Sequence, residues 1–197
     1  RSTSAVRSQK HRCSIVRNGP AVTKLAISGG PKAVKEPLSP NYNMTDLEWD
    51  LARNAVKYSP QTAYLGGERK GGYYVERLED EWCKTFKCNH AVAVNSATSG
   101  LLAACVAAGC GPGDEVVTTP YTMSATAAAP KFLGAKITFA DIDLTTYCLN
   151  PHEVAKHNPR IVIATNLFGH PAPLDELWRQ KHFLIEDNAQ APFAMEH

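Results

Sequence analysis

The 197-residue sequence has no apolar run long enough to cross a membrane. Its longest stretch without charge, residues 91–113, is interrupted by Asn95, Ser96 and Thr98, whereas a membrane helix needs about 20 predominantly apolar residues. The chain also lacks internal repeats and low-complexity tracts. With 44% hydrophobic and 20% charged residues, its composition is that of a soluble globular protein, so we expect no membrane partner.

Several site signatures are absent as well. The six cysteines include neither a C-x-x-C pair nor a Cys/His spacing of the zinc kind, and no G-x-G-x-x-G follows an apolar run. We therefore predict no metal site and disfavour a generic dinucleotide-binding domain. A disulfide framework is not expected at this size, and buried thiols in a reducing, cytoplasmic compartment are the prediction.

Acidic residues are missing from the first 35 positions, which carry eight Lys and Arg; the remainder carries thirteen basic and nineteen acidic residues. This Ser- and Arg-rich head has the composition of a transit peptide, a disordered tail or non-native sequence. Because it shows no clear amphipathic stripe, we predict a basic, disordered tail over residues 1–28 and no nucleic-acid partner. The chain starts with Arg1 and has its first Met at Met44, so we expect a piece of a longer protein.

Helical patterns precede the central part of the chain. Thr45 is a predicted N-cap with Glu48 at the third helical position, typical of a capping box. A second amphipathic helix is predicted by apolar residues at helical spacing, namely Val75, Leu78, Trp82 and Phe86.

Five short apolar runs then alternate with helical or loop segments. They are AVAVN (91–95), EVVTT (115–119), KITFA (136–140), RIVIAT (160–165) and FLIED (183–187). This order is typical of βαβ crossovers, and the continuous apolar runs predict a mostly parallel sheet flanked by helices, an α/β fold. Asn150, Pro151 and Glu153 give the start signals of one connecting helix.

Polar residues follow the predicted strands at the edge where parallel sheets bind ligands. After the first run, residues 96–100 (SATSG) begin a helix whose N–H groups and hydroxyls suit a phosphate; a plain Ser/Thr-rich N-cap explains them equally well. After the last run, Asp187 ends a buried strand, which is costly without a partner such as a protonated cofactor ring. Capping of a following helix is the commoner role of such an Asp.

Two further strand ends carry candidate groups. Tyr121 and Met123 could cover a flat ring from one face, although packing alone explains such side chains. Asp141 and Asp143 follow the third run, where an Asp-x-Asp pair is more often turn chemistry than a magnesium site.

In their joint order these segments resemble the DegT/DnrJ/StrS family of pyridoxal-phosphate-dependent sugar aminotransferases, which have fold type I. The resemblance is carried by seven segments: GGxxVxxLE (71–79), VNSxTSGL (94–101), GPGDEVV (111–117), PYTMSAT (120–126), FADID (139–143), NLFGHPA (166–172) and EDxAQA (186–191). Each is modest alone, but seven in the family's order are specific.

The resemblance implies a site for pyridoxal 5'-phosphate (PLP). Ala97, Thr98 and Ser99 match the family's phosphate-binding turn. Ala97 stands where Gly is usual, which is tolerable if its backbone is not left-handed.

The remaining cofactor contacts are implied in the same way. Met123 stands where the family generally has an aromatic residue over the pyridine ring, so a thioether contact or Tyr121 replaces stacking. Asp187 matches the carboxylate that keeps the ring nitrogen protonated, and Gln190 matches the amide on the side of the phenolic oxygen.

The resemblance further implies a transfer of an amino group from an amino acid, such as glutamate, to a keto sugar nucleotide, in a homodimer. Residues 29–197 would then be part of the large PLP-binding domain of fold type I, without its C-terminal part and without the small domain.

One catalytic residue of the family has no counterpart. The family holds PLP as a Schiff base on a lysine downstream of E-D-x-A-Q, and no lysine follows Gln190 in this chain. We therefore expect either a fragment of a transaminase or a non-catalytic homologue that binds PLP or a nucleotide sugar.

Overall fold

The computed structural model describes residues 24, 26–32, 44–58 and 71–194. The described residues belong to two units, one ending at Arg53 and the other starting at Asn54, and each is taken by itself. The elements are η1 Ala26–Ser28, α1 Asp46–Tyr58, α2 Tyr73–Phe86, α3 Ala97–Ala107, β1 Glu115–Thr118, α4 Ala125–Phe132, β2 Lys136–Phe139, α5 Pro151–Ala155, β3 Ile161–Thr165, α6 Leu174–Arg179 and β4 Phe183–Asp187. Apart from η1, the predicted tail over residues 1–28 lies almost wholly outside the described residues.

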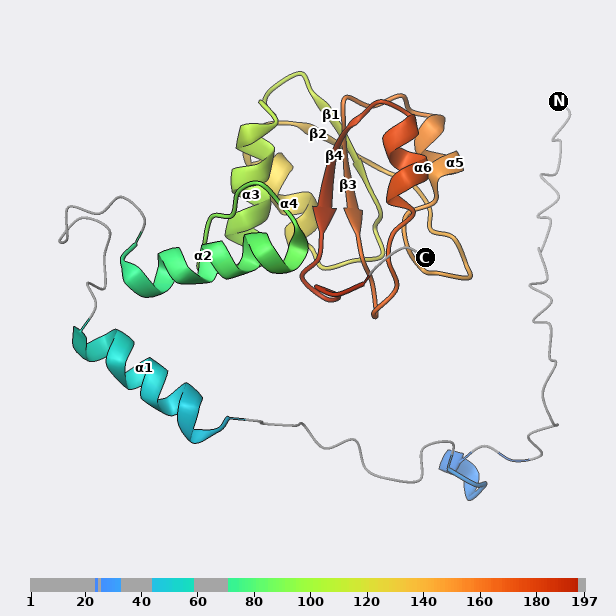
Figure 1. The fold of residues 1–197 in the computed structure, drawn as a ribbon. Coiled ribbons are helices and arrows are strands. Elements are labelled where there is room, and N and C mark those ends of the chain that lie inside the picture. Colours follow the sequence, from blue (N-terminus) through green and yellow to red (C-terminus); the bar gives the residue numbers. More distant parts are fainter. Residues whose placement is uncertain (1–23, 25, 33–43, 59–70, 195–197) are drawn as a thin grey trace, which may run out of the picture. The chain divides into compact units, whose positions relative to one another are not determined.

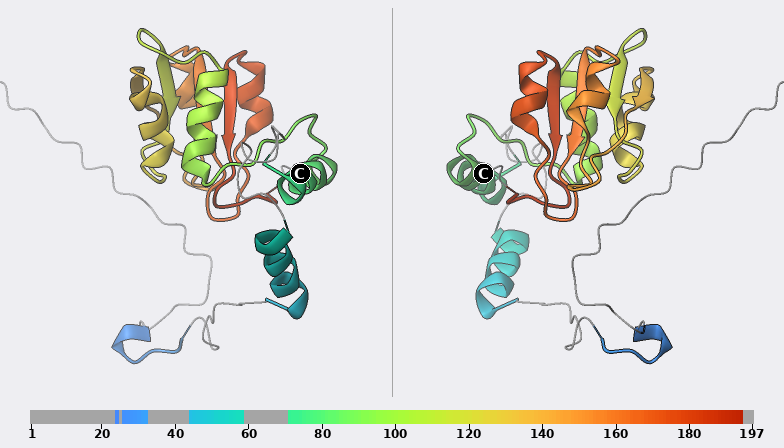
Figure 2. Two further views of the ribbon diagram at one scale, coloured as in Figure 1. Left: turned by 90° about the vertical axis from the view of Figure 1, so that its left-hand side faces the viewer. Right: turned by 90° about the vertical axis from the view of Figure 1, so that its right-hand side faces the viewer.

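A four-stranded parallel sheet forms the centre of the second unit, in the order β2-β1-β3-β4. Helices α3 and α4 cover one face and α5 and α6 cover the other (Figures 1 and 2). The predicted α/β fold with a mostly parallel sheet is confirmed. Because every strand points the same way, all four carboxyl ends lie along one edge of the sheet.

Alternate residues of the central strands supply two separate cores. In β3, Val162 and Ala164 pack in the cluster that contains Leu177 of α6, whereas Ile161 and Ile163 pack in the cluster of α3 and α4. All five residues of β3 are buried. A strand covered on both faces needs apolar residues at every position, which explains the continuous apolar run.

The prediction of a strand in residues 91–95 is wrong. These residues form no strand, and the side chains of Val92 and Val94 are 80% and 48% exposed. The Ala93 N–H donates to Oε1 of Glu79 in α2, at 2.8 Å, instead of to a neighbouring strand. An apolar run becomes a strand only where a partner strand accepts its backbone hydrogen bonds.

The predicted helix starts are confirmed. The backbone N–H of Thr45 donates to Oε2 of Glu48 at 2.7 Å, one half of a capping box at the start of α1. The Asn150 side chain accepts from the His152 N–H at 2.9 Å, and Pro151 is the first residue of α5. None of the described helices is long and apolar enough to span a membrane.

Candidate ligand site at the carboxyl ends of the strands

Asp187 is the last residue of β4 and is only 6% exposed. Its Oδ2 accepts a 2.8 Å hydrogen bond from the Thr126 hydroxyl and a longer one, 3.5 Å, from the Thr165 hydroxyl. Its Oδ1 accepts from the Ala189 N–H at 3.2 Å. Neutral donors therefore hold this buried carboxylate, and none of the ion pairs in the described part of the chain includes it.

The chain after Asp187 does not continue into a helix within the described residues, which form turns from Ala189 to Phe193. The Ala189 contact is a two-residue Asx turn rather than a helix cap. Helix capping, the commoner role considered for this Asp, is thus not what the described structure shows. The carboxylate keeps unused acceptor capacity for a donor that enters from outside.

The N-terminus of α3 lies after the apolar run 91–94. Ser96 is its N-cap, with extended backbone, and its hydroxyl oxygen accepts the Ser99 N–H at 3.2 Å. The Ser99 hydroxyl in turn donates to Oδ1 of Asn95 at 2.6 Å. Ala97 is absent from the left-handed positions of the described chain, which meets the condition for an alanine at this point. The Ser/Thr-rich N-cap is therefore real, and it uses the Ser99 N–H; the N–H groups of Ala97 and Thr98 stay available to an anion.

A cavity of about 490 Å³ joins these two features. Its lining includes Ser96 and Ala97 from the start of α3, Asp187 from the end of β4, and Trp82 from α2. A helix N-terminus favours negative charge, and a buried carboxylate favours a cationic group. The cavity thus suits one ligand with an anionic end and a protonated donor.

The other predicted contacts do not line this cavity. Thr98 and Ser99 line a smaller hollow of about 200 Å³ against α4. Tyr121, in the loop after β1, has its ring centroid 6.2 Å from those of Tyr147 and Phe168. The side chains of Met123 and Gln190 are exposed.

Three residues of the site were missed from the sequence. Thr126 and Thr165 hold the Asp187 carboxylate, and Trp82 supplies an aromatic wall. Thr165 could have been found, because it ends the strand before β4 and pairs with Asp187 in register. Thr126 lies in the resembling segment PYTMSAT, but nothing in its spacing indicates a bond to residue 187.

Asp141 and Asp143 take part in turn chemistry, as the commoner interpretation predicted. Oδ1 of Asp143 accepts the N–H groups of Thr145 and Thr146, at 2.8 and 3.1 Å, and these bonds lower the pKa of the carboxyl. Oδ1 of Asp141 accepts from Ile142 at 2.8 Å. The described residues contain no group of three or more His, Cys, Asp or Glu side chains that could hold a metal ion.

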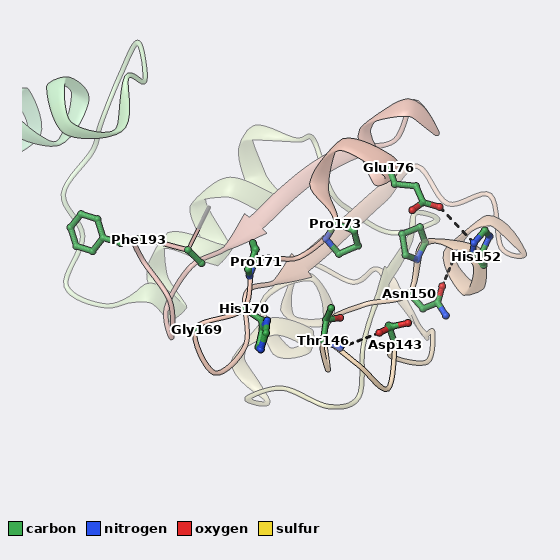
Figure 3. A pocket seen from close by; sticks show the side chains of 12 residues that line it. Asp143, Thr146, Asn150, His152, Gly169, His170, Pro171, Pro173, Glu176 and Phe193 are labelled. Carbon is green, nitrogen blue, oxygen red and sulfur yellow. Dashed lines mark hydrogen bonds and ion pairs between the residues drawn. The ribbon is translucent and has the colours of Figure 1, made fainter. Parts of the chain in front are cut away.

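A larger cavity, about 780 Å³, is lined neither by Asp187 nor by the start of α3 (Figure 3). Its walls include Asp143, Asn150 and His170, and a 3.8 Å pair between Nε2 of His152 and Oε1 of Glu176. It contains none of the predicted cofactor contacts. We therefore base the candidate site on the smaller cavity, where a buried carboxylate faces a helix N-terminus.

Fold and site together define a parallel α/β domain with a candidate ligand site at the carboxyl ends of the strands. The profile of the DegT/DnrJ/EryC1/StrS aminotransferase family matches residues 55–195. The chain belongs to this family, whose members are PLP-dependent aminotransferases of fold type I.

Individual relatives support this family assignment. The spore coat polysaccharide biosynthesis protein SpsC of Bacillus subtilis (strain 168) is 39% identical over 150 residues, which cover 73% of this chain and 38% of SpsC. The structure of 3-amino-5-hydroxybenzoic acid synthase is 28% identical, with a TM-score of 0.68, and the match covers 77% of this chain and 40% of that one.

A more distant structure shows the same fold. It is GDP-4-keto-6-deoxymannose-3-dehydratase with a trapped PLP-glutamate geminal diamine, at 24% identity and a TM-score of 0.65. The match covers 79% of this chain and 41% of that one. The chain thus spans less than half the length of these relatives.

Proposed function

We propose that this chain forms the PLP-binding part of a sugar aminotransferase, which moves an amino group from an amino acid such as glutamate to a keto sugar nucleotide. The observation that carries the proposal is the shared cavity: the buried Asp187 carboxylate and the N-terminus of α3 line the same hollow. A pyridinium ring with a phosphate presents the matching pair of charges. The names of a polysaccharide-biosynthesis relative and a keto-sugar enzyme support the substrate class.

When bound, PLP supplies an electron sink for the bond that breaks at the substrate carbon. Asp187 would accept the hydrogen bond of the protonated ring nitrogen and so keep that proton in place. The hydroxyls of Thr126 and Thr165 hold the carboxylate in one orientation for this contact. A carboxylate that is already held in place loses no rotational freedom when the cofactor binds, so binding avoids this entropic cost.

The first turn of α3 would hold the phosphate. The backbone N–H groups of Ala97 and Thr98 and the Thr98 hydroxyl would be its donors, and the Ser99 hydroxyl would join them by releasing Asn95. Beside them, Tyr121 or Met123 would cover one face of the ring, and Gln190 would approach the phenolic oxygen. Their exposed side chains leave them free to adjust to the cofactor.

The positions of the described lysines support the proposal that none of them is a Schiff-base residue. None lines the 490 Å³ cavity; Lys136 is paired with Glu115 at 2.9 Å and Lys156 with Glu153 at 2.6 Å. We therefore propose that the chain binds PLP reversibly and does not complete the transfer by itself. This observation equally favours a second function, a non-catalytic PLP- or nucleotide-sugar-binding homologue.

The test is a PLP titration of the 197-residue chain followed by absorbance. Saturable binding that reverses on dialysis and leaves no borohydride-fixed adduct is expected. Asp187→Asn should weaken binding by about 10- to 100-fold, because a hydrogen bond to a charged group is worth roughly 1.5–3 kcal/mol. Asp141→Asn, at an exposed turn, is the matched control and should bind as the unmodified chain does.

Absence of saturable binding, or equal affinity in Asp187→Asn, would refute the proposal. Saturable binding of a nucleotide sugar without PLP would select the second function. We also propose, from the family, that the working enzyme is a cytoplasmic homodimer; sedimentation of the PLP-loaded protein measures its assembly.

A further inference from the structure

Two cysteine pairs occupy the same position at the ends of two helices. At the end of α3, Gly109 is left-handed, with φ 67°. Its N–H donates to the Val106 carbonyl, and the Cys110 N–H donates to the Cys105 carbonyl, both at 2.9 Å. This is a Schellman motif, in which the side chains of the two outer residues, here Cys105 and Cys110, contact each other.

Helix α2 ends with the same change of backbone. Lys87 is left-handed, with φ 53° and ψ 34°. Cys83 and Cys88 therefore stand at the positions that Cys105 and Cys110 occupy in α3, four residues before and one after the left-handed residue. The five cysteines of the described residues are free thiols.

The thiols of each pair interact. Burial is the main cause that raises the pKa of Cys83, and its contact with the Cys88 thiol raises it further. Burial also raises the pKa of Cys105 to about 11, again with a contribution from Cys110. In α3 the backbone hydrogen bond from Cys110 to Cys105 brings the two Cα atoms within the roughly 7 Å that a disulfide can span. In α2 the left-handed Lys87 turns the chain in the same way between Cys83 and Cys88, and their thiols are in contact.

The pairs differ in access to solvent. Cys105 is fully buried and Cys110 is half-buried. By contrast, Cys88 is exposed and Cys83 is half-buried. A thiol must meet its oxidant as a thiolate, so the α2 pair is open to reaction and the α3 pair is protected.

We propose that Cys83 and Cys88 form a reversible disulfide by exchange with a small-molecule disulfide such as oxidised glutathione, while Cys105 and Cys110 stay reduced. The Cys88 thiolate attacks one sulfur of the oxidant and releases a first glutathione. The Cys83 thiolate then attacks the Cys88 sulfur and releases the second. Two protein thiols are oxidised, one small disulfide is reduced, and the thiol protons pass to the released glutathione.

The bond would close the C-terminus of α2 against the segment that leads to α3. That segment is already attached to α2 by the 2.8 Å bond from the Ala93 N–H to Glu79. Glu79, Cys88 and Ala93 line one apolar hollow of about 330 Å³ beside Trp82. Trp82 also lines the proposed cofactor cavity, so the disulfide would lie next to a wall of that site.

The test exposes the reduced, folded chain to oxidised glutathione and maps disulfides by mass spectrometry of peptides. The expected product is a Cys83–Cys88 bond, with Cys105–Cys110 forming at least about tenfold more slowly. Cys83→Ser should stop at a glutathione adduct on Cys88, and Cys105→Ser should leave the reaction unchanged. In denaturant the two pairs, equally spaced in sequence, should oxidise at similar rates.

A stable glutathione adduct on Cys88 of the unmodified chain, without conversion to the internal disulfide, would overturn the proposal. So would equal rates for both pairs in the folded chain. Circular dichroism of each variant confirms that it is folded before the rates are compared. The result is independent of PLP binding, so failure here leaves the proposed function standing.

Discussion

The side-chain hydroxyl of Thr126 donates a 2.8 Å hydrogen bond to Oδ2 of Asp187, across 61 residues of sequence. Thr126 lies in the first turn of α4 and is fully buried, whereas Asp187 ends β4. This bond fixes the position of the charged group at the bottom of the candidate site. Its loss should therefore affect both stability and ligand binding.

Replacing Thr126 with valine, which has nearly the same shape, should lower the free energy of unfolding by about 1–3 kcal/mol. The reason is that the Asp187 carboxylate would stay buried with only the 3.5 Å contact to Thr165 and the Ala189 N–H. Urea unfolding followed by circular dichroism measures the change.

The matched control is Thr126→Ser, which keeps the hydroxyl and loses one methyl group. It should retain the greater part of the stability lost in Thr126→Val. An unchanged free energy of unfolding in Thr126→Val would show that this hydrogen bond does not stabilise the fold.

Much of the fold follows from local patterns. The apolar run of β3 and the N-cap Asn150 are decided by neighbouring residues and by burial on two faces, so the sequence predicted them. The run 91–95 has the same local character and is not a strand. Whether it pairs depends on a partner strand elsewhere in the chain, which no window around Val92 contains.

The candidate site could be predicted to a similar extent, because local patterns indicate some of its residues but not the contacts between distant parts of the chain. Asp187 was found because it ends an apolar run that forms β4, and parallel strands end at one edge. The turn at residues 96–100 was found by following the run 91–95, which is not a strand, and Ala97 was assigned by resemblance. Thr126 bonds to Asp187 only through the packing of α4 against the sheet, a distance that the sequence pattern does not contain. Tyr121 and Met123 were placed by resemblance, and their contacts with a cofactor remain predictions.

A pH-dependent prediction concerns Arg160, whose Nε and Nη2 donate to the two oxygens of Asp114 at 2.6 and 2.7 Å. The Arg160 hydrogen bonds, followed by the Gly111 N–H, lower the pKa of the Asp114 carboxyl. A carboxyl with a lowered folded-state pKa stabilises the fold above its unfolded pKa, near pH 4, and loses this effect as the pH falls through the folded value.

Arg160→Lys cannot form the two-pronged contact and should lower the urea midpoint at pH 7. The difference from the unmodified chain should stay constant down to about pH 5 and shrink below about pH 4. Arg179→Lys, at the exposed end of α6, is the control. A difference that is independent of pH would show that Arg160 acts through the Ala108 and Gly109 carbonyls, which it also contacts.

The two-sided burial of the sheet gives a third prediction. Ile163 is fully buried in β3, and Ile163→Ala should reduce the free energy of unfolding by roughly 2–5 kcal/mol, since it removes apolar contacts and leaves a cavity. Val92→Ala, in the exposed run that is not a strand, should change it by about 0.5 kcal/mol or less. Similar losses in both variants would contradict the structure of residues 91–94.

At the start of α3, the Ser96 hydroxyl caps the helix, whereas the Thr98 hydroxyl is free to bind a ligand. The Ser96 side chain accepts the Ser99 N–H, so Ser96→Ala should cost about 1 kcal/mol of stability. Thr98 is exposed, and its hydroxyl has no hydrogen-bond partner among the described residues, so Thr98→Val should leave stability unchanged within about 0.5 kcal/mol.

If the first turn holds the cofactor phosphate, Thr98→Val should weaken PLP binding by about tenfold, the value of one hydrogen bond near 1.4 kcal/mol. It should not change the weaker binding of pyridoxal, which lacks the phosphate. Absorbance titrations of both compounds measure this difference. Equal effects on the two would place Thr98 against the ring instead, because only a contact with the phosphate distinguishes them.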